Sequence, residues 1–367
     1  MIINRADILN FKNIRETQLE FSEGVNCLLG SNGMGKSNLL EAIHFACMAR
    51  PMTSMPESGL ILHGEDMMSV QGTFEMANGS SEKVNIGIVR GKGKTLKRNG
   101  KEYDRISSHI GKFPIVCVTP ADNDVVAGPA QERRRMVDMV LSQCDPSYLA
   151  NLIRYNKSLE NRNSLLRAGI SDPVLFESVE GVLIEAADVV SKARREWVEQ
   201  VAPSIGSIYA HIAGEAEELT LQYRSALNDY TMAEIFDRNR AKDAALGYTS
   251  QGIHRDDIAA DLNGYPLRNY GSQGQVKTFT IALRLAIFGH IKQAGGETPL
   301  LLLDDIFDKL DSGRVGRIMD LVSRSSDFGQ IFITDTNREH IDETLASLTG
   351  PKNLILVEEG RFSPVAE

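Results

Sequence analysis

The pattern of hydrophobic and polar residues in the first third of the chain predicts strands and turns with one helix among them. Apolar and polar residues largely alternate in Thr17–Phe21, Val25–Leu29, Val70–Met76 and Val84–Val89, which is the period of a half-buried strand. Ser37–Ala49 instead carries its apolar residues at helical spacing. We therefore expect a mainly β region that extends to about Cys117.

The middle of the chain changes character and then returns to the first pattern. Residues 131–247 carry apolar positions at the spacing of long amphipathic helices. From Gly271 onward strand and helix alternate again, with elements expected over Pro299–Asp304 (strand), Ser312–Ser323 (helix) and Gln330–Thr334 (strand). This order predicts an α/β lobe that is interrupted by a helical lobe.

The length of the chain fits this division into two lobes. A chain of 367 residues exceeds what one hydrophobic core usually serves. We place residues 1–122 and 290–367 in an α/β first lobe, and residues 123–289 in a helical second lobe. The expected fold class is therefore α/β, with a helical insertion.

Composition and charge exclude some classes of protein. Hydrophobic residues make up 42% and charged residues 24% of the chain, which is typical of a folded globular protein and excludes a disordered one. Forty basic against 49 acidic residues give a net charge of −9. A chain this acidic is not a general coat for nucleic acid, so any such contact must be local.

The sequence gives no reason to expect a membrane protein. No apolar run reaches the roughly 18 residues of a membrane helix, and the N-terminus lacks the pattern of a leader peptide. Four cysteines show no paired or metal-binding spacing. We expect a cytoplasmic protein with no membrane partner.

The strongest chemical signal is the segment Gly30-Ser31-Asn32-Gly33-Met34-Gly35-Lys36-Ser37. It fits G-x-x-x-x-G-K-[ST] and lies between an expected strand and an expected helix, which is the context this motif requires. Its glycines allow backbone N–H groups to surround phosphate oxygens at a helix N-terminus. Lys36 is expected to reach the β- and γ-phosphates, and the Ser37 hydroxyl to hold Mg²⁺.

A second signal is an apolar run that ends in two carboxylates. Leu300–Leu303 predicts a strand buried on both faces, and Asp304 and Asp305 follow it directly. Ligands bind where parallel strands end, so Asp304 is expected in the Mg²⁺ shell. Asp305 is expected to polarise the attacking water. Since 268 residues separate Lys36 from Asp304, a large insertion must divide the nucleotide lobe.

A third signal is Gly271-Ser272-Gln273-Gly274-Gln275, which lies ahead of an expected helix and 32 residues before Asp304 (304 minus 272). A serine at a helix start is a further anion-binding end. Within one subunit this second phosphate site has no obvious ligand. The γ-phosphate held by a partner subunit would supply a ligand for it.

Together these three motifs resemble the ATP-binding-cassette ATPases of the SMC and recombination-repair type, and within that type the RecF family. Segments along nearly the whole chain add to the resemblance: Leu9–Asn13, Asn38–Ile43, Gly128-Pro129, Arg133–Arg135 and Gly252–Asp257. The resemblance implies an ABC-type P-loop ATPase head with the signature motif in the helical lobe. It also implies that Lys12, Asn13, Ser272, Gln273, Gly274 and Gln275 contact ATP.

The resemblance further implies a function and partners. ATP and Mg²⁺ are the implied cofactors, and ATP is implied to drive formation of a homodimer. The implied activity is sequence-independent binding to duplex DNA and to junctions of duplex and single strand. With RecO and RecR, such a protein loads RecA at gaps and supports the SOS response.

Two departures from the cassette pattern affect the expected chemistry. Transporter-type cassettes carry Glu where this chain has Asp305, and the shorter side chain predicts slow ATP hydrolysis. The switch histidine of such ATPases falls near Asp335, where this chain has Ile333-Thr334-Asp335-Thr336 and no histidine.

Two clusters of basic residues are candidate DNA contacts. One expected hairpin carries Arg90, Lys92, Lys94, Lys97, Arg98 and Lys101; it either contacts the phosphate backbone or is a solvated hairpin. Arg133–Arg135 begins a helix, where cations are unfavourable, so it either binds phosphate or pairs with acids across the lobes. His254–Asp257 is interpreted as an interlobe ion-pair network near the ATP site, with a metal-nuclease site as the weaker alternative.

Other classes of function remain as alternatives. A transporter ATPase subunit is disfavoured by Asp305 and by the segments named above. Another SMC-like ATPase acting on DNA fits the motifs, but a nuclease-associated one needs a metal-nuclease domain for which the sequence leaves no room. A clamp that binds ATP without hydrolysing it would differ in turnover.

Overall fold

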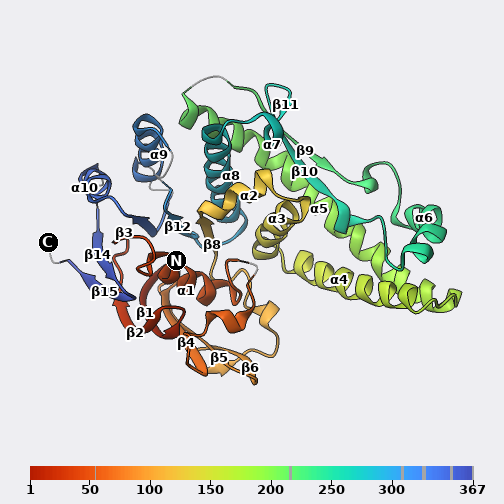
Figure 1. The fold of residues 1–367 in the computed structure, drawn as a ribbon, viewed down its shortest axis with the longest axis horizontal. Helices are drawn as coiled ribbons and strands as arrows, with labels where there is room; N and C mark the ends of the chain where they lie inside the picture. Colours follow the sequence, from red (N-terminus) through yellow and green to blue (C-terminus); the bar gives the residue numbers. More distant parts are fainter. Residues whose placement is uncertain (54, 215–216, 307–309, 325–327, 348–349, 366–367) are drawn as a thin grey trace. The chain divides into compact units, whose positions relative to one another are not determined.

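The chain forms two compact units, Met1–Pro120 with Leu283–Glu367, and Ala121–Ala282 (Figure 1). The structure, a computed structural model, describes residues 1–53, 55–214, 217–306, 310–324, 328–347 and 350–365. Each unit is described by itself below. Helix α8 (Gln273–Ala294) contains the boundary between them.

The first unit is built around a six-stranded, mainly parallel sheet in the order β15-β14-β3-β13-β12-β8. Its strands come from both ends of the chain: β3 (Val25–Leu29), β8 (Ile115–Val118), β12 (Leu300–Asp304), β13 (Ile331–Asp335), β14 (Lys352–Glu358) and the antiparallel β15 (Arg361–Pro364). All five residues of β3 and of β12 are buried. This is the burial expected of a parallel sheet covered on both faces.

A second, antiparallel sheet in the same unit has the order β2-β1-β4-β5-β6-β7. Its strands are β1 (Ile2–Phe11), β2 (Ile14–Glu20), β4 (Met67–Glu75), β5 (Ser81–Val89), β6 (Gly93–Arg98) and β7 (Lys101–Glu102). Buried residues alternate with partly buried ones along most of β4 and β5. One face of this sheet therefore contributes to the core.

The first unit also contains the helices α1 (Lys36–Met48), α9 (Ser312–Arg324) and α10 (Arg338–Ser347), and the C-terminal part of α8 from Leu283 on. Helix α1 begins directly after the loop that follows β3. Nearly all of α1 is buried, including Leu40, Ile43 and Phe45. It contacts both sheets, so the loop ahead of it has a rigid support.

The second unit is helical, with a small sheet on one side. Its helices are α2 (Asn123–Ala127), α3 (Ala130–Cys144), α4 (Pro146–Arg167), α5 (Pro173–Ala213), α6 (Met232–Leu246) and α7 (Leu267–Tyr270). Helices α4 and α5 lie side by side (Figure 1). The sheet has the order β11-β10-β9, from β9 (Leu219–Arg224), β10 (Asp257–Leu262) and β11 (Tyr265–Pro266).

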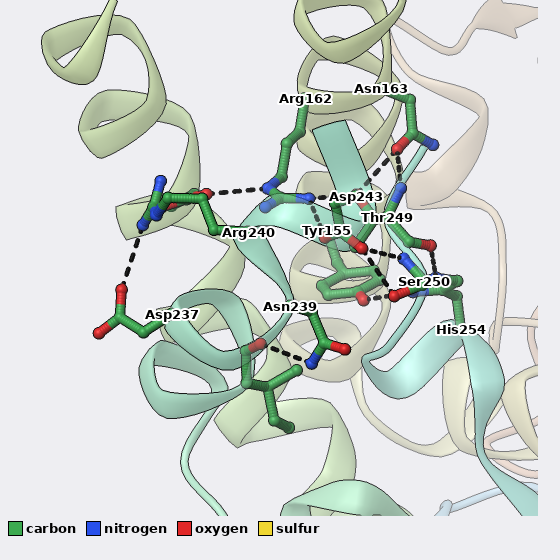
Figure 2. A network of polar contacts seen from close by, with 12 residues as sticks. Tyr155, Arg162, Asn163, Asp237, Asn239, Arg240, Asp243, Thr249, Ser250 and His254 are labelled. Atoms are coloured by element: carbon green, nitrogen blue, oxygen red, sulfur yellow. Dashed lines mark hydrogen bonds and ion pairs between the residues drawn. The ribbon is translucent and has the colours of Figure 1, made fainter. Parts of the chain in front are cut away.

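A buried cation holds the helices of this unit together (Figure 2). Arg162 on α4 is 0% exposed. Its guanidinium donates to Glu180 of α5 at 2.9 Å and to Asp243 of α6 at 2.8 Å, and it lies 4.4 Å from the ring centroid of Phe236. One side chain thus joins three helices.

The predicted elements mostly match the observed ones. The strand at Val25–Leu29 is confirmed, and the helix predicted over Ser37–Ala49 is observed as Lys36–Met48. The prediction of helices throughout residues 131–247 is wrong at β9, where leucines and Tyr223 alternate with polar residues as in a strand. No helix in the described part of the chain combines the length and apolar character needed to cross a membrane.

Candidate functional site

The phosphate loop lies between β3 and α1, and its backbone requires glycine. Gly33 and Gly35 have φ angles of +81° and +116°, a region that side-chain-bearing residues rarely adopt. A Cβ on Gly35 would also lie 2.9 Å from Oδ1 of Asn13. Ser31, Asn32 and Gly33 are exposed, so the open side of the loop is accessible to a ligand.

Lys36 already reaches across the loop. Its side chain is nearly buried, and Nζ donates to the carbonyl oxygens of Gly30 at 2.7 Å and Ser31 at 3.2 Å. Over the described ranges, no carboxylate forms an ion pair with this ammonium group. A buried charge held only by neutral carbonyls favours an anionic ligand.

Asp304 joins the phosphate loop to the neighbouring strands. Its Oδ1 accepts hydrogen bonds from the Ser37 hydroxyl and from the Thr334 hydroxyl, both at 2.8 Å. Burial raises the pKa of this carboxyl above its ordinary value. The Ser37 hydroxyl and the Asp304 carboxylate, predicted from the sequence as Mg²⁺ ligands, therefore lie in direct contact. They fit a Mg²⁺ ion that is completed by phosphate oxygens.

Asp305 occupies a strained turn at the end of β12. Its φ is +45°, which costs a residue with a side chain on the order of 1 kcal/mol. Its N–H donates to the Thr334 hydroxyl at 2.9 Å. Thr334 thus holds both aspartates, a role that the sequence analysis missed because a threonine at the end of a strand carries no distinctive motif.

Asn13 supports the phosphate loop. Its Nδ2 donates to the carbonyl oxygen of Met34 at 3.2 Å, and its Oδ1 accepts from the Asn38 amide at 2.8 Å. The N–H of Gly360, in the turn between β14 and β15, donates to the same Met34 carbonyl at 2.7 Å. The amide groups of Asn13 are thus engaged by the loop and by α1.

Lys12 also has a partner within the unit. Its ammonium group forms an ion pair with Glu41 of α1. Glu41 is buried, and its second carboxylate oxygen has no hydrogen-bond partner in the described structure. In the structure as described, Lys12 therefore neutralises a buried acid; contact with a nucleotide stays a prediction.

At the end of β13 the structure places a histidine that the sequence analysis missed. Asp335 is buried, and its Oδ2 lies 3.2 Å from Nδ1 of His340 on α10. The backbone carbonyl of Asp335 accepts from the N–H of Gly30 at 3.4 Å. An imidazole is thus attached to the strand end where a switch histidine was expected, although it lies five residues later in the sequence.

The segment Ser272–Gln275 lies in the second unit, at the start of α8. The N–H of Gln275 donates to the Ser272 hydroxyl at 3.2 Å, and the N–H of Ser272 donates to Oε1 of Gln275 at 2.8 Å. This reciprocal pair is a capping box. Ser272 and Gln273 are exposed, so this helix start is open to a ligand, and its contact with ATP stays a prediction.

The basic hairpin divides into structural and exposed residues. Lys94 donates to the carbonyl oxygen of Ala49 at 2.6 Å and pairs with Glu57, and Arg98 forms a two-bond pair with Glu82 at 2.6 and 2.9 Å. These two residues stabilise the sheet. The others are exposed and remain candidates for DNA: Arg90, Lys92, Lys97 and Lys101.

The arginines of α3 contact groups of their own unit. Arg133 binds both carboxylate oxygens of Asp257, at 2.6 and 3.1 Å, and Arg134 donates to the backbone carbonyl of Asp256. The interpretation of Asp256 and Asp257 as part of an interlobe network is therefore wrong, because these partners all belong to the second unit.

The metal-nuclease alternative finds no support in the same cluster. The Asp256 carboxylate lies 3.0 Å from Arg194 and that of Asp257 is bound by Arg133. In the part of the chain that the structure describes, no group of three or more His, Cys, Asp or Glu side chains could hold a metal ion by itself.

The fold and the phosphate loop together define an SMC-type head. Residues 2–350 match the RecF/RecN/SMC N-terminal domain family. The structure is similar to the Smc head domain of Pyrococcus furiosus, with a TM-score of 0.60 over 99% of this chain and 95% of that one, at 16% identity. This likeness concerns the fold alone.

Full-length relatives give a narrower assignment. The DNA replication and repair protein RecF of Parabacteroides distasonis is 44% identical over 100% of both chains. A solved structure described as the recombination mediator protein RecF with ATP, in the RecFOR pathway, has a TM-score of 0.89 at 29% identity, covering 99% of this chain and 97% of that one. The chain belongs to the RecF family of DNA replication and repair proteins.

Proposed function

We propose that this chain is an ATP-dependent, DNA-binding recombination mediator that dimerises on ATP and hydrolyses it slowly. The observation that carries the proposal is the contact between Ser37 and Asp304 beside the ammonium group of Lys36. These three groups are positioned for a nucleoside triphosphate with Mg²⁺. The relative solved with ATP supports the choice of nucleotide.

In this proposal the residues of the first unit bind and orient the nucleotide. The loop N–H groups and Lys36 hold the phosphates, while Ser37 and Asp304 hold Mg²⁺, which supplies charge neutralisation of the triphosphate. Asp305 orients the water for attack on the γ-phosphate. Its short side chain and strained backbone support slow turnover.

The dimer is proposed from the second unit. Ser272 begins α8 with an exposed hydroxyl that is already part of a capping box. Bound to the γ-phosphate of a partner subunit, this helix start would complete two equivalent sites in a two-fold dimer. ATP then stabilises the dimer through contacts that a monomer lacks.

DNA binding is proposed for the exposed residues of the basic hairpin, without choice of sequence, because phosphate contacts carry affinity but no sequence information. Function with RecO and RecR in loading RecA in the cytoplasm, and support of the SOS response, rest on the family. The RecFOR description of the solved relative supports this part.

The nucleotide site is tested with Lys36→Ala. We expect equilibrium dialysis to show loss of nearly all ATP affinity, because no other cation of the described loop lies between the β- and γ-phosphate positions. Lys97→Ala, an exposed lysine of the same unit, is the matched control. ATP binding by Lys36→Ala at the level of the control would refute the assignment.

The composite site is tested by mixing two inactive variants. Ser272→Arg should bind ATP but fail to dimerise in sedimentation, and Lys36→Ala should fail to bind it. In a mixed dimer, one site combines the intact loop of the first chain with the intact Ser272 of the second. Since neither variant should dimerise on ATP alone, the dimers in an equal mixture should be mixed ones with one intact site of two, and turnover should recover to at most about half of wild type. No recovery, with dimers present, contradicts the composite site.

DNA binding is tested with the exposed set and a matched pair. Replacing Arg90, Lys92, Lys97 and Lys101 by Gln should weaken duplex binding and reduce the salt slope by about 0.9 per lost phosphate contact. Lys157→Gln/Lys242→Gln, exposed lysines of the helical unit, should leave the slope unchanged. Equal slopes in all three proteins would show that the hairpin is only solvated.

A further inference from the structure

Strand β9 forms the open edge of the small sheet in the second unit. Among the residues that the structure describes, it pairs only with β10, with Asp257 opposite Arg224 and Leu262 opposite Leu219. The N–H of Asn263 donates to the carbonyl oxygen of Glu218. By the alternation of an antiparallel pair, Thr220, Gln222 and Arg224 also bond to β10. The backbone groups of Leu219, Leu221 and Tyr223 therefore point away from it.

The open edge borders a cavity rather than flat surface. A cavity of about 560 Å³ is lined by four residues of β9, by a stripe of α5 and by Leu227 and Asn228. The α5 stripe consists of Arg195, Val198, Glu199 and Ala202. A helix beside an open strand edge leaves a trough that an extended chain can occupy.

One side chain of the protein already bonds to this edge. The Asn228 amide donates to the carbonyl oxygen of Tyr223 at 3.1 Å. An amide N–H is what a neighbouring strand would supply at that position. Within the described residues, no hydrogen bond reaches the N–H or carbonyl of Leu221, the next outward-pointing residue. The N–H and carbonyl of Leu221 are therefore the backbone groups of this edge to which an added strand would bond.

The charges in the trough indicate the chemistry of the occupant. Arg195 donates to Oδ1 of Asn228 at 3.0 Å, and Arg224 donates to Oε1 of Gln222 at 3.2 Å. Both guanidinium groups thus have neutral amides as partners. Across the described ranges, neither forms an ion pair with a carboxylate, although Glu199 also lines the trough.

We propose that β9 accepts an extended, acidic segment of a partner protein as an added strand, with its carboxylates on Arg195 and Arg224. The hollow that continues past Asn228 has a mixed lining, with the acids Asp188, Asp229 and Glu234 and the bases Lys192 and Arg195. This inference uses no residue of the nucleotide site and does not rest on the proposed function.

The test uses three probes on the full chain: a (Val-Glu)₄-Val peptide, the charge-inverted (Val-Lys)₄-Val peptide, and purified RecR and RecO. Amide hydrogen exchange is followed residue by residue. The acidic peptide should protect the amides of Leu221 and Tyr223, while the Gln222 amide, already bonded to β10, should not change. The basic peptide should bind at least tenfold more weakly.

Two variants distinguish strand addition from non-specific binding of the peptide. Leu221→Pro removes the outward N–H without breaking a bond to β10, and Arg195→Glu/Arg224→Glu reverses the charge. Each should weaken the acidic peptide at least tenfold, and Glu199→Gln should strengthen it. Thermal unfolding checks that each variant folds, and ATP turnover should stay at the wild-type level.

Four results overturn the proposal. They are absence of protection at millimolar acidic peptide, equal protection by both peptides, unchanged protection in folded Leu221→Pro, and protection that rises with protein concentration alone. The last would indicate that a second copy of this chain covers the edge. If RecR or RecO binds and leaves the Leu221 amide exchanging freely, that partner binds elsewhere on the chain. The peptide experiment then decides whether β9 accepts an added strand.

Discussion

The buried guanidinium of Arg162 offers a sharp test of how the helical unit is stabilised (Figure 2). Among the described residues, Arg162→Leu removes the one charged partner of Oδ2 of Asp243 and leaves Glu180 with the half-exposed Arg240 at 3.3 Å. Asp243 is 1% exposed, so water cannot replace the lost contact. Removing one partner of a buried ion pair costs about 3–5 kcal/mol.

This loss of stability corresponds to a decrease in melting temperature of about 6–20 °C, at about 2–4 °C per kcal/mol for a unit of this size. Calorimetry measures the shift, and amide exchange in α4, α5 and α6 assigns it to the helical unit. Arg240→Leu is the control, because its pairs are partly solvated and worth at most about 1 kcal/mol. A melting temperature of Arg162→Leu within 2 °C of wild type would refute the reasoning.

Three further predictions concern other sites. Asp305→Asn should slow ATP turnover at least tenfold and accumulate the ATP-bound dimer in sedimentation; normal turnover would exclude Asp305 from orienting the water. Asn13→Ala removes the hydrogen bond to Met34 and should weaken ATP binding three- to tenfold by dialysis, at about 1 kcal/mol per hydrogen bond; unchanged affinity would show that the loop keeps its shape without it. Burial lowers the pKa of His109 from 6.5 to about 4, so the unfolded chain binds the proton first as the pH falls from 7 to 5. The free energy of unfolding then falls by about 2 kcal/mol between pH 7 and pH 5. Denaturant titrations of His109→Gln should not show this decrease.

The phosphate loop and the two aspartates were predictable because their chemistry restricts residue type and order. Gly33 and Gly35 need positive φ, and an apolar strand that ends in Asp304 places a carboxylate at the ligand-binding edge of a parallel sheet. The sequence also predicted β3 with its observed bounds. These features are local, or follow from one general rule of sheet topology.

The supporting residues were not predictable, because their roles come from contacts between distant segments. Thr334 reaches Asp304 only because β13 lies beside β12, and His340 reaches Asp335 through the turn into α10. Lys94 and Arg98 appear in the sequence as members of a charge run. Only the fold shows that Arg98 pairs with Glu82 of the neighbouring strand β5, and that Lys94 pairs with Glu57 in the segment ahead of β4.

Strand β9 was missed for a different reason. Its alternation of apolar and polar residues is present in the sequence, but it lies between two long helical stretches, and the surrounding pattern outweighed six residues. The open edge that follows from it was therefore invisible before the structure.

The order in which strands enter the parallel sheet has a consequence for synthesis of the chain on the ribosome. Strand β3 is flanked by β13 and β14, and β14 ends at Glu358, 329 residues after Leu29. At about 5–20 residues per second, this apolar strand waits about 15–65 seconds for its neighbours. The helical unit, which has its own contacts, is complete well before then. The apolar strand ahead of the phosphate loop therefore stays without its sheet neighbours for most of the synthesis of the chain.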